Sequence, residues 1–146
     1  MMMSGDLGGF IEDENNLSHD GNCWVYYDAL LYDYARVFDN AKIYGNAHVF
    51  YNAWICNYAG VYGDAKVSGF ACIQSHAKVY DHAVIRNRAK IHGSVYGKAQ
   101  VSYTLKLWGN IYGTAKLKRK SKIRCIQSNH EFYKSDKIID ISDTEK

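Results

Sequence analysis

The residues best suited to chemistry in this 146-residue chain are basic, and they gather in its second half. Residues 82–130 contain no Asp or Glu but eleven Lys and Arg, whereas residues 1–81 carry ten acids and four bases, so the net charge of +3 hides a strong asymmetry. Arg suits phosphates because its guanidinium forms forked hydrogen bonds with them. The basic half therefore indicates a site for a nucleotide, coenzyme A or a nucleic acid strand. The alternative is a solvated positive end that aids solubility or blocks end-to-end stacking. The eleven are Arg86, Arg88, Lys90, Lys98, Lys106, Lys116, Lys118, Arg119, Lys120, Lys122 and Arg124.

Tyrosines form the second pattern, because six of them recur at intervals of 16 or 18 residues. Three functions fit such a column: stacking of the rings on one another, a subunit interface, or stacking on the bases or sugars of a ligand. For the interface we expect Trp24, Tyr26, Tyr44 and Tyr62, and for the ligand cleft Tyr80, Tyr96 and Tyr112.

A six-residue repeat must position both patterns. Eighteen aliphatic residues follow one another at this spacing, with two slips of two residues, after Ile91 and after Leu107. A period of six is typical of a parallel β-solenoid, in which each unit buries one aliphatic side chain and turns a corner. The eighteen are Val25, Leu31, Val37, Ile43, Val49, Ile55, Val61, Val67, Ile73, Val79, Ile85, Ile91, Val95, Val101, Leu107, Ile111, Leu117 and Ile123.

Three units make one triangular turn of 18 residues, because the tyrosines directly follow the aliphatic residues of only one face in three. This reading stacks Lys122 on Lys106 and Lys90, and Lys118 on Ser102 and Arg86. Alanines such as Ala29 and Ala47 mark narrow inward corners, and glycines such as Gly45 mark turns with positive φ. The sequence therefore predicts an all-β chain of about six turns over 25–124, with an N-terminal cap over 1–24 and a C-terminal cap over 125–146, in one domain.

The units AKIYGN, AHVFYN, AGVYGD and AKVSGF resemble those of the hexapeptide-repeat family over residues 25–123. The opening GGFIEDENNLSHDGNCWVY is similar to a transferase-like subgroup found in bacterial and phage genomes. The resemblance implies a left-handed parallel β-helix and a homotrimer with ligand clefts between adjacent prisms. It also implies that an enzyme of this type would be an acyltransferase, with acyl-coenzyme A as cofactor and a histidine as general base.

For that base the candidates are His92, which projects from the third face, and His76, at a corner one turn earlier. The chain lacks the long loop insertion and the C-terminal extension that many such transferases carry, and no Ser-His-Asp set, phosphate loop or metal-ligand cluster is readable. The four cysteines have no zinc-ligand spacing, which favours reduced thiols and the cytoplasm. Neither a signal peptide nor a membrane span is expected.

We therefore expect a cytoplasmic homotrimer that binds an anionic small molecule, preferably a nucleotide, without turning it over. Sequestration of a signalling nucleotide is one form of this function, given the phage subgroup. The alternatives are the acyltransferase and a purely structural solenoid, and a nucleic acid strand is a less favoured partner. No metal is expected and coenzyme A is the cofactor only of the enzyme. The expected phosphate ligands are Arg86, Arg88, Lys90, Lys118, Arg119 and Lys120.

Overall fold

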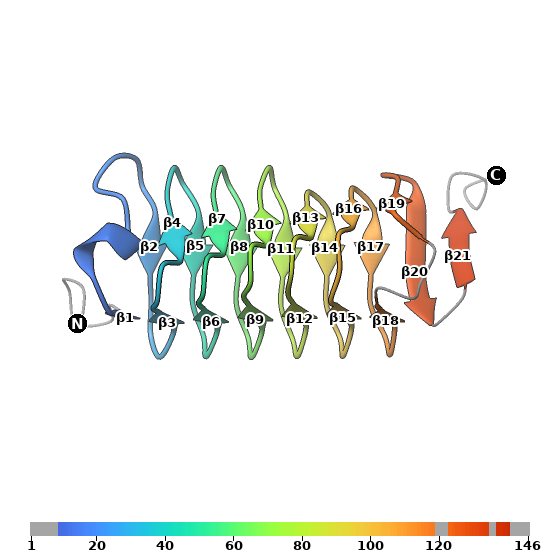
Figure 1. Ribbon diagram of the computed structural model, residues 1–146, viewed down its shortest axis with the longest axis horizontal. Coiled ribbons are helices and arrows are strands. Elements are labelled where there is room, and N and C mark those ends of the chain that lie inside the picture. Colours follow the sequence, from blue (N-terminus) through green and yellow to red (C-terminus); the bar gives the residue numbers. More distant parts are fainter. Residues whose placement is uncertain (1–8, 119–122, 135–136, 141–146) are drawn as a thin grey trace.

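The computed structural model describes residues 9–118 and 123–134 and the backbone of residues 137–140. It shows a parallel β-solenoid of about seven turns, which follow one another along the long axis of the molecule (Figure 1). Six of the turns contribute one short strand to each of three sheets, and the strands before and after them extend two of the sheets. The described residues include no α-helix, only the 3-10 helix η1 (Glu14–Asn16), which the Asp13 side chain caps. The predicted all-β parallel solenoid is thus confirmed, but it has about seven turns rather than the six predicted, because a strand at Phe10–Ile11 already pairs with Leu30–Leu31.

The first face is an eight-stranded sheet that holds the column of tyrosines. Its strands lie in the order β2, β5, β8, β11, β14, β17, β20 and β21, all parallel except the last pair. The hairpin formed by β20 and β21 closes this end of the sheet. The strands are β2 (Trp24–Val25), β5 (Lys42–Ile43), β8 (Gly60–Val61), β11 (Lys78–Val79), β14 (Ser94–Val95), β17 (Asn110–Ile111), β20 (His130–Lys134) and β21 (Lys137–Asp140).

The second and third faces are parallel sheets of seven and six strands. The second face consists of β1 (Phe10–Ile11), β3 (Leu30–Leu31), β6 (His48–Val49), β9 (Lys66–Val67), β12 (Val84–Ile85), β15 (Gln100–Val101) and β18 (Lys116–Leu117). The third face consists of β4 (Arg36–Val37), β7 (Trp54–Ile55), β10 (Cys72–Ile73), β13 (Lys90–Ile91), β16 (Lys106–Leu107) and β19 (Cys125–Ile126). We call the turns from first to second face the first corner, those from second to third the second corner, and those back to the first face the third corner.

The aliphatic residue of each strand points inward and is buried. Val25, Ile43 and Val61, for example, have no exposed surface, and neither have the corner alanines Ala29 and Ala47. Each turn thereby buries three branched side chains and small corner residues, and this burial provides the main stabilising free energy of the prism.

Both predicted slips are present at the third corner. Lys78 pairs with Ser94, and Ser94 with Asn110, so that neighbouring strands there stand 16 residues apart. The corner shrinks to two residues, His92–Gly93 and then Trp108–Gly109. Gly93 is required there because a Cβ would collide with the carbonyl of Gly109.

The final predicted position of the aliphatic column is wrong. Leu107 pairs with Ile126 rather than with Ile123, and Lys106 pairs with Cys125 rather than with Lys122. The physical reason lies in the second corner of the last turn, where Ile126 follows Leu117 by nine positions instead of six. Ile123 packs against the core from a partly buried position.

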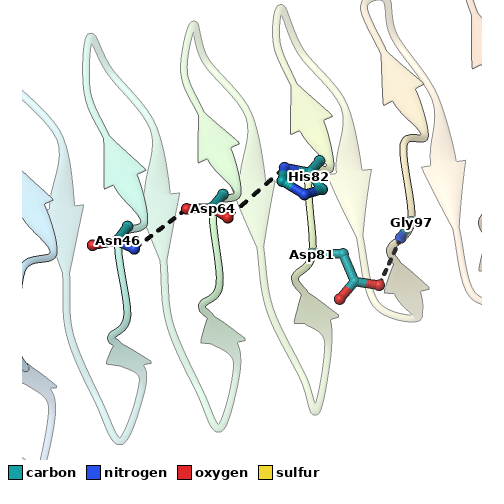
Figure 2. Close-up of polar contacts among 5 residues, drawn as sticks. All are labelled: Asn46, Asp64, Asp81, His82 and Gly97. Atoms are coloured by element: carbon teal, nitrogen blue, oxygen red, sulfur yellow. Dashed lines mark hydrogen bonds and ion pairs between the residues drawn. The ribbon is translucent and has the colours of Figure 1, made fainter.

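The residue two places after each buried aliphatic one adopts a left-handed backbone in most turns. Asp39, Asn57 and Asp81 do so at φ 56–58°, which Asp and Asn tolerate better than most other non-glycine residues. Their side chains accept hydrogen bonds from the backbone of the next turn. The Asp81 carboxylate accepts from the Gly97 N–H at 3.1 Å (Figure 2).

A second polar ladder runs along the first corner on the surface. The Asn46 amide donates to Asp64 at 3.4 Å, and the Asp64 carboxylate lies 3.8 Å from Nδ1 of His82 (Figure 2). These contacts connect three successive turns in the axial direction. All three side chains face solvent, so these contacts help to align successive turns but contribute little to the free energy of unfolding.

Candidate functional site

The basic residues surround the second corner in the later turns of the solenoid. Arg86 follows β12, Arg88 occupies the corner itself, and Lys90 begins β13, where it pairs with Lys106 of β16. All four side chains are exposed. The structure thus brings three of the predicted phosphate ligands, Arg86, Arg88 and Lys90, onto consecutive positions around one edge of the prism.

Lys118 is exposed on the second face, just after β18, in the same column as Ser102 and Arg86. The backbone hydrogen bonds from Arg86 to Val101 and from Ser102 to Leu117 give this column its register. Arg119, Lys120 and Lys122 lie outside the described residues. The predicted stack of Lys122 on Lys106 is wrong, because Cys125 is the residue that pairs with Lys106.

A hollow of about 530 Å³ opens at this edge, along the second corner from Gly69 to Arg124. Two arginines border it, and each rests on an aromatic ring. The Arg88 guanidinium carbon lies 4.9 Å from the centroid of the Phe70 ring, and that of Arg124 lies 5.2 Å from the Tyr103 ring. The lining residues are Gly69, Phe70, Asn87, Arg88, Tyr103, Thr104 and Arg124.

Tyr103 shapes the hollow by turning inward. It is buried, its hydroxyl donates to the carbonyl of Ile123, and burial raises its pKa despite the opposing effect of Arg124. Two turns before Tyr103, the N–H of Phe70 donates to the carbonyl of Asn87 at 2.6 Å. The equivalent N–H of Arg88 has no acceptor within the described part of the chain. The hollow therefore combines guanidinium groups with an unused backbone donor, which is the chemistry an oxyanion requires.

Three basic residues of this edge have no acidic partner among the described residues. Residues 82–130 contain no Asp or Glu, and Arg86, Arg88 and Lys90 form no ion pair with any described residue. Stacked like charges repel one another, as Lys90 and Lys106 must on neighbouring strands. Binding of an anion would relieve this repulsion.

The tyrosine column forms a continuous stack at the first corner. Tyr44 and Tyr62 lie parallel with their centroids 4.6 Å apart, and the stack continues through four further rings at spacings of 4.9–5.8 Å. Tyr26 contacts Tyr44 edge-on, and Trp24 contacts Tyr26 in the same way. The further rings are Tyr80, Tyr96, Tyr112 and Tyr133.

This stacking limits what the tyrosines can offer a partner. The faces of the inner rings are covered by their neighbours, which leaves the ring edges and hydroxyls for other contacts. Burial and the neighbouring Tyr44 and Tyr80 raise the pKa of Tyr62 from 10.0 to about 12. Within one chain, the predicted ligand-cleft residues Tyr80, Tyr96 and Tyr112 stand at the first corner and the arginines at the second.

The two histidine candidates both lie at the third corner, on successive turns, and each stacks on a different aromatic ring. The His92 ring stacks on Trp108, with centroids 4.7 Å apart and planes 3° from parallel, and its Nδ1 lies 2.9 Å from Oγ of Ser75. The His76 ring stacks on Tyr58 at 5.1 Å. Burial, and then the charge of Lys90, lowers the pKa of His92.

Sequence reasoning missed Gly69, Phe70, Asn87, Tyr103 and Thr104 as lining residues. It counted Arg124 among the basic residues suited to phosphate but not among the expected phosphate ligands. The signal for one pair was present, since Phe70 stands one turn of 18 residues before Arg88 in the same column. No group of three or more His, Cys, Asp and Glu side chains that could hold a metal occurs within the described residues. The four cysteines, all described, are free thiols.

In the described residues we find no helix of the length and apolar character that crossing a bilayer demands. Comparison with models of known protein families, with curated proteins and with solved structures gives no match to this chain.

Proposed function

We propose that this protein binds a phosphate-bearing anion, a nucleotide in the first place, at the second-corner hollow and the basic residues around it. The observation that carries this proposal is the pair of arginines, Arg88 and Arg124, each supported by an aromatic ring at one hollow in a region of the chain without acids. A stacked guanidinium is partly ordered before binding, so less conformational entropy is lost when it contacts a phosphate.

Different lining residues would contact different parts of the ligand. Arg88, Arg124 and the N–H of Arg88 would contact phosphate oxygens, while Arg86, Lys90 and Lys118 raise the local positive potential. The exposed edge of Phe70 and the hydroxyl of Thr104 would contact the sugar or base. Because the hollow lies in the surface of a single chain, binding by this route does not need a second subunit.

Titration calorimetry at low salt tests the proposal with ATP, inorganic phosphate and adenosine as probes. We expect ATP to bind, phosphate to bind more weakly and adenosine weakest, and we expect Arg88→Ala with Arg124→Ala to abolish binding. Lys66→Ala is the control, because Lys66 is an exposed lysine on β9 that does not line the hollow. Equal affinity of the double variant and the control would overturn the proposal.

We further propose that the solenoid is a left-handed one of the hexapeptide-repeat type and that it assembles as a homotrimer. The six-residue repeat, the corner alanines and the narrow three-sided cross-section support this assignment, which rests on the resemblance of the repeat units. Sedimentation equilibrium gives the test. A monomer would overturn the trimer but would leave the hollow within one chain intact.

A further inference from the structure

Ser75 and His92 form a contact that the turn structure does not itself require. Ser75 stands at a left-handed position of the third corner with φ 59°, where Asp39 and Asn57 stand in the two preceding turns. Its N–H donates to the Asn57 side chain at 2.9 Å, and its carbonyl accepts from the Tyr58 N–H at 2.9 Å. These two bonds to the preceding turn fix the backbone that carries the Ser75 hydroxyl. The Ser75 hydroxyl reaches upward to His92 Nδ1 at 2.9 Å.

His92 is well placed to accept a proton from this hydroxyl. Stacking against Trp108 at 4.7 Å orients the imidazole ring, and the ring is only half-exposed. Partial burial, and then the nearby charge of Lys90, lowers the pKa of His92 and so favours the neutral imidazole. A neutral imidazole with an oriented nitrogen 2.9 Å from a hydroxyl is the arrangement in which a histidine activates a serine.

The shortened third corner leaves a third group available beside this pair, the backbone N–H of His76. At the third corner the N–H of Asn40 donates to the Asn57 carbonyl, and the N–H of Tyr58 donates to the Ser75 carbonyl. The next turn contains only His92 and Gly93 at this corner, so the N–H of His76 finds no acceptor in the described chain. His76 directly follows Ser75, and the N–H after a nucleophilic serine is a common donor to the oxyanion that forms on the attacked carbonyl.

We propose that Ser75 is a nucleophile activated by His92 and that this pair cleaves small carboxylic esters through an acyl-serine. In the first step Ser75 Oγ forms a bond to the ester carbonyl carbon, its proton passes to His92 Nδ1, and the bond to the alcohol oxygen breaks. The proton on His92 leaves with the alcohol. In the second step water attacks the acyl carbon and gives a proton to His92, the bond between that carbon and Ser75 Oγ breaks, and His92 returns the proton to Oγ. The carboxylic acid leaves, and the Ser75 hydroxyl and the neutral imidazole are restored.

The exposure of the pair defines the class of substrate. Ser75 and His92 are half-exposed and His76 is exposed, on a narrow corner between two faces. A small ester with a good leaving group can reach this corner, whereas a long acyl chain would remain in water. This reaction uses different residues from the anion site, which lies at the second corner, and so goes beyond the proposed function.

The experiment uses p-nitrophenyl acetate with the full-length protein. We expect release of about one equivalent of p-nitrophenol per chain in a first phase, followed by slower turnover, as an acyl-serine accumulates. Peptide mapping by mass spectrometry should place the acetyl group on Ser75. Ser75→Ala and His92→Gln should each lower the first-phase rate roughly tenfold or more, while Ser94→Ala, on the neighbouring β14, should leave it unchanged.

Acetyl groups found only on histidine or lysine side chains of the wild-type protein would overturn the proposal, even if Ser75→Ala failed to fold. A Ser75→Ala variant that folds and retains the first phase would overturn it too. Arg88→Ala with Arg124→Ala should keep the esterase reaction, so that loss of anion binding and loss of ester cleavage can be told apart.

Discussion

The Arg88 guanidinium carbon lies 4.9 Å above the Phe70 ring, and the two residues occupy equivalent positions in successive turns of the solenoid. Stacking along the axis therefore brings a cation onto an aromatic face without any change in the backbone repeat. The contact contributes about 0.5–1 kcal/mol at an exposed site. Its larger consequence is that the guanidinium is held at the edge of the hollow beside Arg124 and Tyr103.

The affinity for an anion should depend on this support. Phe70→Ala keeps every charge but removes the ring beneath Arg88, and we expect it to weaken ATP binding roughly three- to tenfold, as an Arg with more rotamer freedom loses more entropy on binding. Calorimetry measures the change. Phe10→Ala is the matched control, since Phe10 is an exposed phenylalanine in β1 at the other end of the second face. If the two variants bound ATP equally well, the ring would have no part in the site.

The tyrosine stack should stabilise the fold even though its rings are on the surface. Tyr80 stacks on both Tyr62 and Tyr96, so Tyr80→Ala removes two ring pairs, and we expect a loss of about 1–3 kcal/mol in the free energy of unfolding. Tyr34 is 79% exposed and contacts no other ring among the described residues, so Tyr34→Ala should change stability by less than about 0.5 kcal/mol. Urea denaturation followed by circular dichroism compares the two. Similar losses for both variants would show that the stack is not stabilising.

High pH should destabilise the protein through the same stack. The pKa of Tyr62 is raised from 10.0 to about 12 because burial and its neighbours disfavour the phenolate. The folded state thus holds the Tyr62 proton more tightly than the unfolded state does. The resulting stability is complete below pH 10 and is lost as pH rises through about 12.

Alkaline titration with circular dichroism and tyrosinate absorbance measures this loss. Tyr62→Phe keeps a stacked ring that cannot ionise, so its stability should fall less steeply over the same pH range. A steeper fall for Tyr62→Phe than for the wild-type protein would contradict the assignment.

Two glycines give a direct test of the turn geometry. Gly45 has φ +67°, and a Cβ there would lie 2.9 Å from the backbone N of Gly63, so Gly45→Ala should destabilise the protein by about 1–2 kcal/mol or more. Gly60 lies in β8 without a positive φ, and its Cβ would meet the Tyr62 ring at 3.7 Å and the Lys42 carbonyl at 3.9 Å, which are ordinary contacts. We expect Gly60→Ala to be neutral or to stabilise by up to about 1 kcal/mol. Thermal unfolding separates the two variants, and the reverse order would refute the turn assignment.

The regular part of the fold could be predicted from the sequence because one aliphatic residue per strand must be buried. Val79 and Val95 revealed the first slip, since any other alignment would have exposed a core position. The same rule misplaced the end of the column at Ile123, because hydrophobicity alone does not distinguish Ile123 from Ile126. The nine-residue step after Leu117 is a departure from the repeat, and a pattern of period six carries no information about such a departure.

The sequence could predict the positive charge of the candidate site, but not the hollow that forms there. Residues 82–130 carry no acid, and that alone directs attention to Arg86, Arg88 and Lys90. The hollow, however, depends on Tyr103, which occupies a turn position where an outward side chain would be expected, yet is buried and bonded to the Ile123 carbonyl. The Ser75 contact with His92 depends likewise on a corner shortened by two residues, which brings two side chains together that are 17 positions apart.

The most direct test of the central claim is the affinity of the full-length protein for ATP, measured by calorimetry at low salt for the wild type, the Arg88→Ala with Arg124→Ala variant and Lys66→Ala. The account predicts binding to the wild type and to Lys66→Ala, a marked decrease with added salt, and no binding to the double arginine variant. Retention of wild-type affinity after removal of both arginines, or no affinity of the wild type for any phosphate-bearing probe, would contradict it.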